Sequence, residues 1–217
     1  MRFELRTSTD LENYTSSLRA MEERVHRIYQ EDSLPFLWFL EYPPLFTQGR
    51  SVGEPSCEPL SFPLFKTNRG GKTTYHGPGQ RIVYVMMDLK EYGQDVKLFV
   101  YFLEEWIIET LKQLGVQGKR APGRTGVWVN TARGEEKIAA IGVRLQKWVT
   151  SHGFSLNVSP DLTAYDEITP CGLKEHGVTS LKALDISVSL EAVDQILLDT
   201  LPTVFNRIMK GVVDGYC

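Results

Sequence analysis

The chain has 217 residues, of which 42% are apolar and 24% charged, proportions that are ordinary for a globular protein with a real core. Its formal net charge of −3 gives no overall basic field that would indicate nucleic acid or an anionic membrane as a partner. No apolar run reaches the ~18 residues of a membrane span, and Met1–Arg6 alternates like a strand instead of forming a signal peptide. We therefore expect a cytoplasmic protein with a single domain over residues 1–217.

The three cysteines are odd in number and widely separated: Cys57, Cys171 and Cys217. They form no C-x-x-C pair, so the spacing indicates neither a disulfide framework nor a zinc site. A reducing compartment suits such a chain best. Cys57 lies in a Gly-, Pro- and Ser-containing stretch, where we expect an incidental loop cysteine.

The first third of the chain predicts a helix, a strand and a loop. Thr9 and Glu12 have the spacing of a capping box, and a helix is expected over residues 10–31. Its apolar residues recur every three or four positions, as Leu11, Tyr14, Leu18, Met21, Val25 and Ile28. Residues 36–42 are apolar and aromatic and predict a buried strand before a proline pair. Residues 45–62 lack periodicity and predict a surface loop.

The centre of the chain predicts strand, loop, strand and helix. Residues 64–68 and 81–89 are the two strands, and the segment 69–80 between them is rich in glycine. Asp95 is a suitable N-cap for a helix that ends near Leu114, where Gly115 stops it.

The last part predicts an antiparallel meander and a final helix. Its three strands cover residues 126–130, 137–145 and 148–158. A helix is expected from Ser189 to about residue 210, kinked or split at Pro202. The predicted fold class is α/β (α+β), with a mixed, mainly antiparallel sheet and three main helices.

The glycine-rich segment concentrates polar residues between two apolar strands. Residues 69–80 contain four glycines together with an arginine, a lysine and a histidine. The end of a Walker A motif is present in Gly71-Lys72-Thr73, but the earlier glycine and the following helix are missing. Glycines let a ligand approach main-chain amides closely. We therefore expect a binding loop, the alternative being an ordinary hairpin with a hydrogen-bonded histidine.

Pro170-Cys171-Gly172 can hold a thiol at the end of a turn, because proline fixes φ and glycine leaves room around it. A nearby cation would stabilise the thiolate and lower the pKa of such a thiol. Lys137, at the start of an apolar strand, can supply this charge if it points into a cavity; otherwise it extends to solvent. His76 and His152 are further candidates, although a buried cysteine or histidine is often only structural.

At this point the motifs resemble those of the lipoyl(octanoyl) transferases. The resemblance covers most of the chain and is carried in order by RGGKTTYHGPGQ (69–80), GRTGVWVN (123–130), KIAAIGVR (137–144), SHGFSLNVSPDL (151–162) and ITPCGLKEHGVTSL (168–181). It implies a fold like that of the catalytic domain of biotin and lipoate protein ligases. Lys72 and the long turn over 130–136 depart from the expected pattern.

The resemblance also implies roles for individual residues. Cys171 matches the nucleophile and Lys137 the group that activates it, with His152 and Gly172 as supporting residues. The segments that match the acyl pocket supply Arg69, Gly70, Gly71, Lys72, Thr73, Thr74, Tyr75, His76, Ala140, Ile141, Gly142, Gly153, Phe154 and Ser155.

The implied reaction is octanoyl transfer from octanoyl-acyl carrier protein, through a thioester on Cys171, to a lysine of a lipoyl domain. Acceptors would be lipoyl domains of 2-oxoacid dehydrogenase complexes or the glycine cleavage H protein. The resemblance implies no ATP, metal or other cofactor, because the donor thioester is already activated.

Three alternatives remain. An ATP-dependent lipoate or biotin ligase would share the fold without needing a nucleophilic cysteine. A lipoyl or octanoyl amidotransferase would use a cysteine but take its acyl group from another carrier domain. A non-catalytic module that binds acylated proteins would leave the pairing of Lys137 with Cys171 without a purpose.

Overall fold

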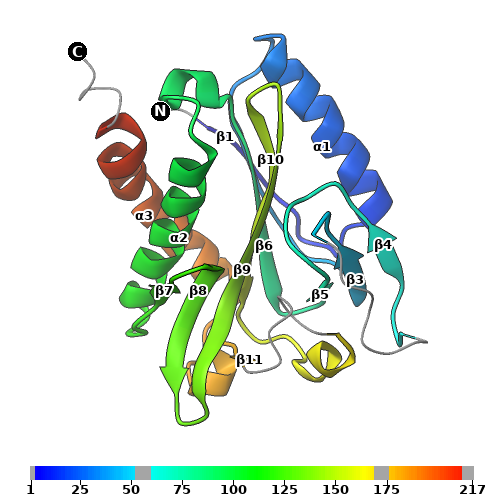
Figure 1. The fold of residues 1–217 in the computed structure, drawn as a ribbon, viewed down its shortest axis with the longest axis vertical. Coiled ribbons are helices and arrows are strands. Elements are labelled where there is room, and N and C mark those ends of the chain that lie inside the picture. Colours follow the sequence, from blue (N-terminus) through cyan, green and yellow to red (C-terminus); the bar gives the residue numbers. More distant parts are fainter. Residues whose placement is uncertain (1–2, 52–59, 169–175, 212–217) are drawn as a thin grey trace.

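The structure, a computed structural model, describes residues 3–51, 60–168 and 176–211. Its main sheet has the strand order β1-β2-β6-β10-β9-β8-β7, and β11 pairs with β9 beside this path (Figure 1). The β1–β2 and β9–β11 pairs are parallel and the others are antiparallel, so the mixed sheet predicted above is confirmed. The strands are β1 (Glu4–Thr7), β2 (Phe36–Leu40), β6 (Gln80–Met86), β7 (Lys119–Ala121), β8 (Arg124–Thr131), β9 (Gly134–Gln146), β10 (Val149–Asn157) and β11 (Gly177–Val178).

A second, three-stranded sheet has the order β4-β3-β5 and carries part of the glycine-rich segment. Its strands are β3 (Leu45–Gln48), β4 (Leu64–Lys66) and β5 (Thr74–His76). The prediction of a loop over 45–62 is wrong at its start, since β3 is a fully buried strand. The two prolines before it and its short length hid the strand, which is formed by pairing with distant segments.

Three α-helices pack on the main sheet: α1 (Tyr14–Tyr29), α2 (Val96–Gln113) and α3 (Leu190–Phe205). Asp95 and Ser189 cap α2 and α3 through their side chains, as predicted. The predicted cap of α1 is wrong, because Asn13 accepts the hydrogen bond from the Ser16 amide and the helix starts there. Glu12 instead accepts hydrogen bonds from Arg6 and Ser8. Among the described helices, none is long and apolar enough to cross a bilayer.

Shorter helical segments complete the chain. Three 3₁₀ turns occur in the described ranges, at Leu89–Tyr92, Thr163–Glu167 and Lys182–Leu184. The last helix is not split at Pro202: α3 continues to Phe205, and a π-helical segment follows over Asn206–Lys210. Pro202 removes one amide donor from the helix, and the wider π-helical segment lies within the two turns that follow this proline.

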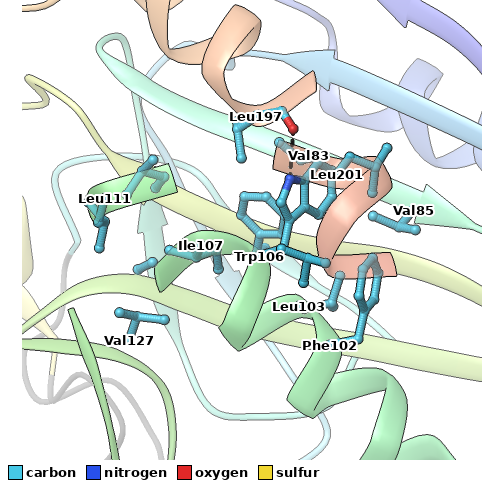
Figure 2. Packing of buried hydrophobic residues seen from close by; sticks show 14 of the residues in the cluster. Val83, Val85, Phe102, Leu103, Trp106, Ile107, Leu111, Val127, Leu197 and Leu201 are labelled. Atoms are coloured by element: carbon cyan, nitrogen blue, oxygen red, sulfur yellow. Dashed lines mark hydrogen bonds between the residues drawn. The ribbon is translucent and has the colours of Figure 1, made fainter. Parts of the chain in front are cut away.

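The helices divide between the two faces of the sheet. Figure 1 shows α2 and α3 together on one side and α1 on the other. The α2/α3 face holds the larger apolar cluster, in which Trp106 is fully buried and its indole Nε1 donates to the Leu197 carbonyl oxygen at 2.8 Å (Figure 2). Phe102 stacks on Trp106 and meets Phe205 edge-on. This face therefore provides a rigid apolar support for the central strands.

The α1 face has a smaller apolar cluster, built from α1 and from alternate residues of β2 and β6. Trp38 and Leu40 of β2 lie in this cluster, whereas Leu37 and Phe39 lie in the opposite one, because successive side chains of a strand point to opposite faces. The candidate site lies on this face too, beside β9 and β10 of the main sheet and β5 of the second sheet.

Candidate functional site

A pocket opens on the α1 face of the sheet and encloses about 780 Å³ of empty space, its mouth included. We call it the central pocket. The glycine-rich loop, β9 and β10 form most of its walls, and α1 and β6 contribute aromatic side chains. Its lining residues are Tyr14, Arg69, Gly71, Lys72, Thr73, Thr74, His76, Ile82, Tyr84, Lys137, Ala140, Ile141, Gly142, His152, Gly153, Phe154, Ser155, Asn157, Tyr165 and Val178.

The glycine-rich loop is held against the sheets by Arg69. The Arg69 Nη2 atom donates to the carbonyl oxygen of Thr47 at 2.7 Å and to its Oγ1 at 2.8 Å. Gly71 has φ +84, a conformation that glycine adopts without strain. A Cβ atom on Gly49 would lie 2.3 Å from the Gly71 carbonyl oxygen, so the two backbones meet only because Gly49 has no side chain.

Small residues on β9 and β10 make room for the pocket. Gly142 pairs with Gly153, and Ala140 pairs with Ser155. A Cβ on Gly153 would lie 2.1 Å from the Val83 carbonyl oxygen, which excludes any side chain there. Phe154 lies between two of these residues in sequence, but its ring packs edge-on against Trp106 on the opposite face. The narrow strip of small residues therefore leaves a channel beside the sheet.

Lys137 is buried at one end of the pocket. Its Nζ donates to the Thr125 carbonyl oxygen at 2.8 Å and lies 4.6 Å from the centroid of the Trp128 ring. Gly126, between those two residues, has φ +112, and a Cβ there would lie 3.4 Å from the Lys137 Nζ and 2.6 Å from the Ala139 carbonyl oxygen. The side chain of Lys137 therefore points into the protein and does not extend to solvent.

An acidic residue of α2 lies close to this lysine. The Glu104 carboxylate accepts a hydrogen bond from the Gly126 amide at 2.9 Å. Burial raises the pKa of Glu104, against the lowering effect of that hydrogen bond and of the positive charges of Arg120 and Lys137. The sequence motifs did not indicate Glu104, because an acidic residue in an amphipathic helix normally faces solvent.

His76 belongs to a buried hydrogen-bond network. Its Nδ1 lies 2.7 Å from the Gln80 Oε1, and its Nε2 lies 3.2 Å from the Thr47 Oγ1. An amide oxygen only accepts, so Nδ1 carries the proton and Nε2 accepts from the Thr47 hydroxyl. Burial, and then the charge of Arg69, lowers the pKa of His76 to about 4. Both ring nitrogens of this neutral imidazole are engaged, which favours positioning over proton transfer.

The network continues through Gln80 to β10. The Gln80 Nε2 donates to the Asn157 Oδ1 at 2.9 Å and to the Tyr165 hydroxyl at 3.0 Å. Asn157 in turn donates to the Thr179 carbonyl oxygen at 3.0 Å. The hydroxyl of Thr73 is also buried and has no hydrogen-bond partner within the described part of the chain. One wall of the pocket is therefore polar and fixed by buried hydrogen bonds.

His152 lies at the other end of the pocket from Lys137. Its ring meets Tyr84 edge-on at 5.6 Å between centroids. Burial, followed by the charges of Arg69 and Arg144, lowers the pKa of His152 to about 3, so the ring is neutral at pH 7.

Two tyrosines that the motifs did not indicate enclose this end. Burial raises the pKa of Tyr14 to about 12 and raises that of Tyr84 further, so both hydroxyls stay protonated. From the sequence, Tyr14 belongs to a helix seam and Tyr84 to a buried strand. Neither pattern distinguishes a residue of the core from one that lines a cavity.

The structure brings most of the predicted pocket residues together. Twelve of the fourteen positions taken from the resemblance line the central pocket, as do Lys137 and His152. Gly70 lies beside the pocket and its amide donates to the Val143 carbonyl oxygen at 2.9 Å. Tyr75 points away and packs against Phe46 and Tyr165.

The predicted nucleophile Cys171, its neighbour Gly172 and the loop residue Cys57 lie outside the described residues. Residues 177–179 lie beside Lys137. Val178 of β11 pairs with Lys137 in a parallel bridge, and the Thr179 amide donates to the Lys137 carbonyl oxygen at 3.0 Å. His176, just before β11, packs edge-on against Trp128.

Comparisons with a family model and with curated proteins agree on one family. The model for the lipoyl protein ligase A/B catalytic domain matches residues 13–202. An octanoyltransferase of Paramagnetospirillum magneticum is 48% identical over 94% of this chain and 97% of its own length. An octanoyltransferase of Zymomonas mobilis is 46% identical over 92% of this chain and 93% of its own.

Solved structures of similar fold have much lower identity. A bipartite lipoate protein ligase from Thermoplasma acidophilum superposes with a TM-score of 0.72 at 17% identity, covering 95% of this chain and 84% of that one. A lipoate-protein ligase A bound with ATP gives 0.74 at 18% identity, covering 95% and 86%. At such identity the likeness concerns the fold alone.

Proposed function

This chain belongs to the lipoyl protein ligase A/B catalytic domain family, and from that premise we propose that it is an octanoyltransferase of protein lipoylation. The observation that carries the proposal is the 46–48% identity to octanoyltransferases over more than nine-tenths of the chain. A lipoate ligase is supported only by the shared fold. The donor we propose is octanoyl-acyl carrier protein, and the acceptor is a lysine of a lipoyl domain.

The geometry of the central pocket supports a linear acyl substrate. Glycine, alanine and serine residues of β9 and β10 line the pocket together with the bulkier Tyr14, Ile82 and Tyr84, and the small residues leave room for an unbranched chain. Pockets of this kind bind mainly through apolar contact, with a few polar groups that fix orientation. Lys137 supplies one such group, and the hydroxyl of Thr73, which has no partner among the described residues, supplies another.

In the proposed first step, the Cys171 thiolate attacks the carbonyl carbon of the donor thioester. A new carbon–sulfur bond forms, the bond to the carrier sulfur breaks, and the carrier thiolate leaves and takes up a proton. Lys137 favours the thiolate of Cys171 by its positive charge. Backbone amides near Gly172 and the glycine-rich loop stabilise the oxyanion of the tetrahedral intermediate.

In the second step, the amine of the acceptor lysine attacks the acyl-enzyme. The carbon–nitrogen bond of the amide forms as the Cys171 sulfur leaves as a thiolate, and the amine gives up one proton. The neutral states of His76 and His152 at pH 7 suit walls of a pocket that holds an apolar chain. The reaction needs no ATP, since the energy comes from the donor thioester.

Mass spectrometry of the enzyme mixed with octanoyl-acyl carrier protein tests the proposal. We expect a mass gain of one octanoyl group on Cys171, lost when an unmodified lipoyl domain is added and transferred to its lysine as an amide. Cys171→Ser should abolish both, and Cys57→Ser should preserve both. Transfer that requires ATP and free octanoate would point to the ligase instead, and transfer only from an acylated lipoyl domain to the amidotransferase.

Lys137→Met tests the role of the lysine separately. The substitution keeps most of the side-chain volume but removes the charge, so the thiol of Cys171 should react with iodoacetamide at a higher pH than in the wild type. Lys147→Met, at an exposed lysine that follows β9, is the matched control. An unchanged alkylation profile in Lys137→Met would remove the proposed role of that lysine.

A further inference from the structure

A second cavity adjoins the central pocket at His152 and lies between α1, residues 66–68 and the β9–β10 hairpin. We call it the α1 cavity; it encloses about 460 Å³ of empty space, its opening included. Its lining residues are Leu18, Met21, Glu22, Val25, Lys66, Thr67, Asn68, Arg144, Gln146, Ser151 and His152. Among the described residues, His152 alone lines both the α1 cavity and the central pocket.

The backbone of His152 explains how its ring separates the two spaces. His152 pairs with Val143, whose side chain packs in the α2/α3 cluster, and cross-strand partners normally share a face. His152 instead has φ +60 in the middle of β10. Its ring meets Tyr84 of the α1 face, and its amide donates to the Met21 sulfur at 3.1 Å. The left-handed conformation thus turns the side chain to the face where the pocket lies.

The position of this ring along the sheet is opposite the reacting end. The Lys137 Nζ donates to the Thr125 carbonyl oxygen, and Val127, two residues further along β8, pairs with Ala139. The amine therefore lies about level with Ala140 and Ile141 of β9, two to three residues from Val143. That is about 7–10 Å along an extended strand, a distance comparable with the length of an octanoyl chain. At one end of the central pocket Val178 pairs with Lys137. At the other end Tyr84 pairs with Gly153, which follows His152. An acyl chain attached near Lys137 and running along the strip of small residues would therefore point its methyl end at His152.

We propose that His152 is a specificity-determining residue, whose ring closes the far end of the acyl channel and limits the length of the acyl chain. The inference rests on the proposed function and adds a structural limit on the length of its acyl substrate. Beyond the ring, α1 presents Leu18, Met21 and Val25 to the α1 cavity. These apolar side chains would contact the additional methylenes of a longer chain once the ring is removed.

The left-handed backbone makes His152→Gly a favourable test. Glycine adopts φ near +60 without strain, so the substitution removes the ring while keeping the strand. His152→Asn also suits this conformation, since asparagine is enriched there, and it serves as the second variant if the glycine variant does not fold. Asp185→Gly is the matched control, because Asp185 also has φ +60 and lines neither cavity.

The first measurement is binding of octanoate and dodecanoate by calorimetry, with folding checked by circular dichroism. The wild type should bind octanoate more tightly than dodecanoate. Removing the ring should shift the ratio of the two dissociation constants toward dodecanoate by about tenfold or more, because one methylene too many in a closed apolar pocket typically has an effect of this size. Asp185→Gly should keep the wild-type ratio. An unchanged ratio in a folded His152→Gly or His152→Asn protein overturns the proposal.

The second measurement is kcat/KM for octanoyl- and dodecanoyl-acyl carrier protein, and the same shift in ratio is expected. Binding does not depend on transfer, so the two proposals fail in different ways. A wild type that transfers no octanoyl group contradicts the proposed function. A ratio that stays fixed in the binding experiment contradicts the role of His152, whatever the transfer assay gives.

Discussion

The two faces of the main sheet are built from the same strands but have different interiors. The α2/α3 face is an apolar cluster with few buried polar contacts: the hydrogen bonds of Trp106 and of Thr110 with Thr200, and the Arg81–Asp194 ion pair. The α1 face combines a smaller apolar cluster with a pocket and a buried polar network around Gln80. One face supports the sheet and the other is shaped for a ligand.

The difference arises from the alternation of side chains along β9 and β10. Ile141 and Phe154 pack toward the α2/α3 cluster, whereas their neighbours Gly142 and Ser155 leave space on the other face. Close packing on one face fixes the strands, because a dense core resists displacement. Small residues can then be tolerated on the opposite face without the sheet collapsing into the space they leave.

The largest effect on stability is therefore expected on the α2/α3 face. Phe102→Ala should lower the free energy of unfolding by about 3–5 kcal/mol, because it removes a fully buried ring and leaves a cavity. Tyr101→Ala, one position away and 41% exposed, is the control and should cost far less. Denaturant unfolding measures both. Where the protein remains folded, the octanoyl chain-length preference of Phe102→Ala should equal that of the wild type; a changed preference would show that the faces are not independent.

The pocket face should dominate the response to acid. The pKa of His152 falls from 6.5 to about 3 on folding, so between these values the unfolded chain binds a proton that the folded protein does not. Above pH 6.5 the buried imidazole has no destabilising effect. As the pH falls through this window, the free energy of unfolding decreases by about 1.4 kcal/mol per pH unit for one group. At pH 4 the loss reaches up to about 3 kcal/mol.

His152→Asn should remove this one-proton slope from the plot of unfolding free energy against pH. Asp194 acts with the opposite sign, because burial raises its pKa to about 6 despite the neighbouring Arg81. Its contribution to the pH dependence is the same in the variant and the wild type, so it cancels when the two plots are compared. Gln30→Asn, at the exposed C-cap residue of α1, changes no titratable group and is the control; its plot should run parallel to that of the wild type. Equal slopes for His152→Asn and wild type would mean that the buried imidazole is charged.

Much of the fold follows from local patterns in the sequence. The caps at Asp95 and Ser189 and the buried run of β2 were predictable, because a side-chain oxygen before a periodic stretch and a continuous apolar run each have one common structural outcome. β3 was missed because it depends on pairing with β5, and pairing between distant segments leaves no local pattern. The predicted start of α1 is wrong because the Thr9–Glu12 spacing matches a capping box, whereas Glu12 accepts hydrogen bonds from Arg6 and Ser8 and Asn13 caps the helix.

The candidate site was predictable only where residue type and motif coincide. Glycine at 142 and 153 and the polar residues of the glycine-rich loop came from ordered motifs and do line the pocket. Tyr14 and Glu104 were missed, since their surroundings are set by tertiary packing. The left-handed conformation of His152 was also invisible, because histidine is not a residue that requires it.

The smallest of the expected effects tests whether the polar network adds stability beyond shape. Gln80→Met preserves most of the volume but leaves the buried Asn157 oxygen and the His76 Nδ1 without their partner, which should cost about 1–3 kcal/mol. Leu156→Met, a swap of similar volume at a fully buried position of the α2/α3 cluster, should cost less than about 1.5 kcal/mol. Denaturant unfolding compares the two. If Gln80→Met cost no more than Leu156→Met, the hydrogen bonds of the pocket face would contribute no more than packing does, and the two faces would differ in chemistry but not in what stabilises them.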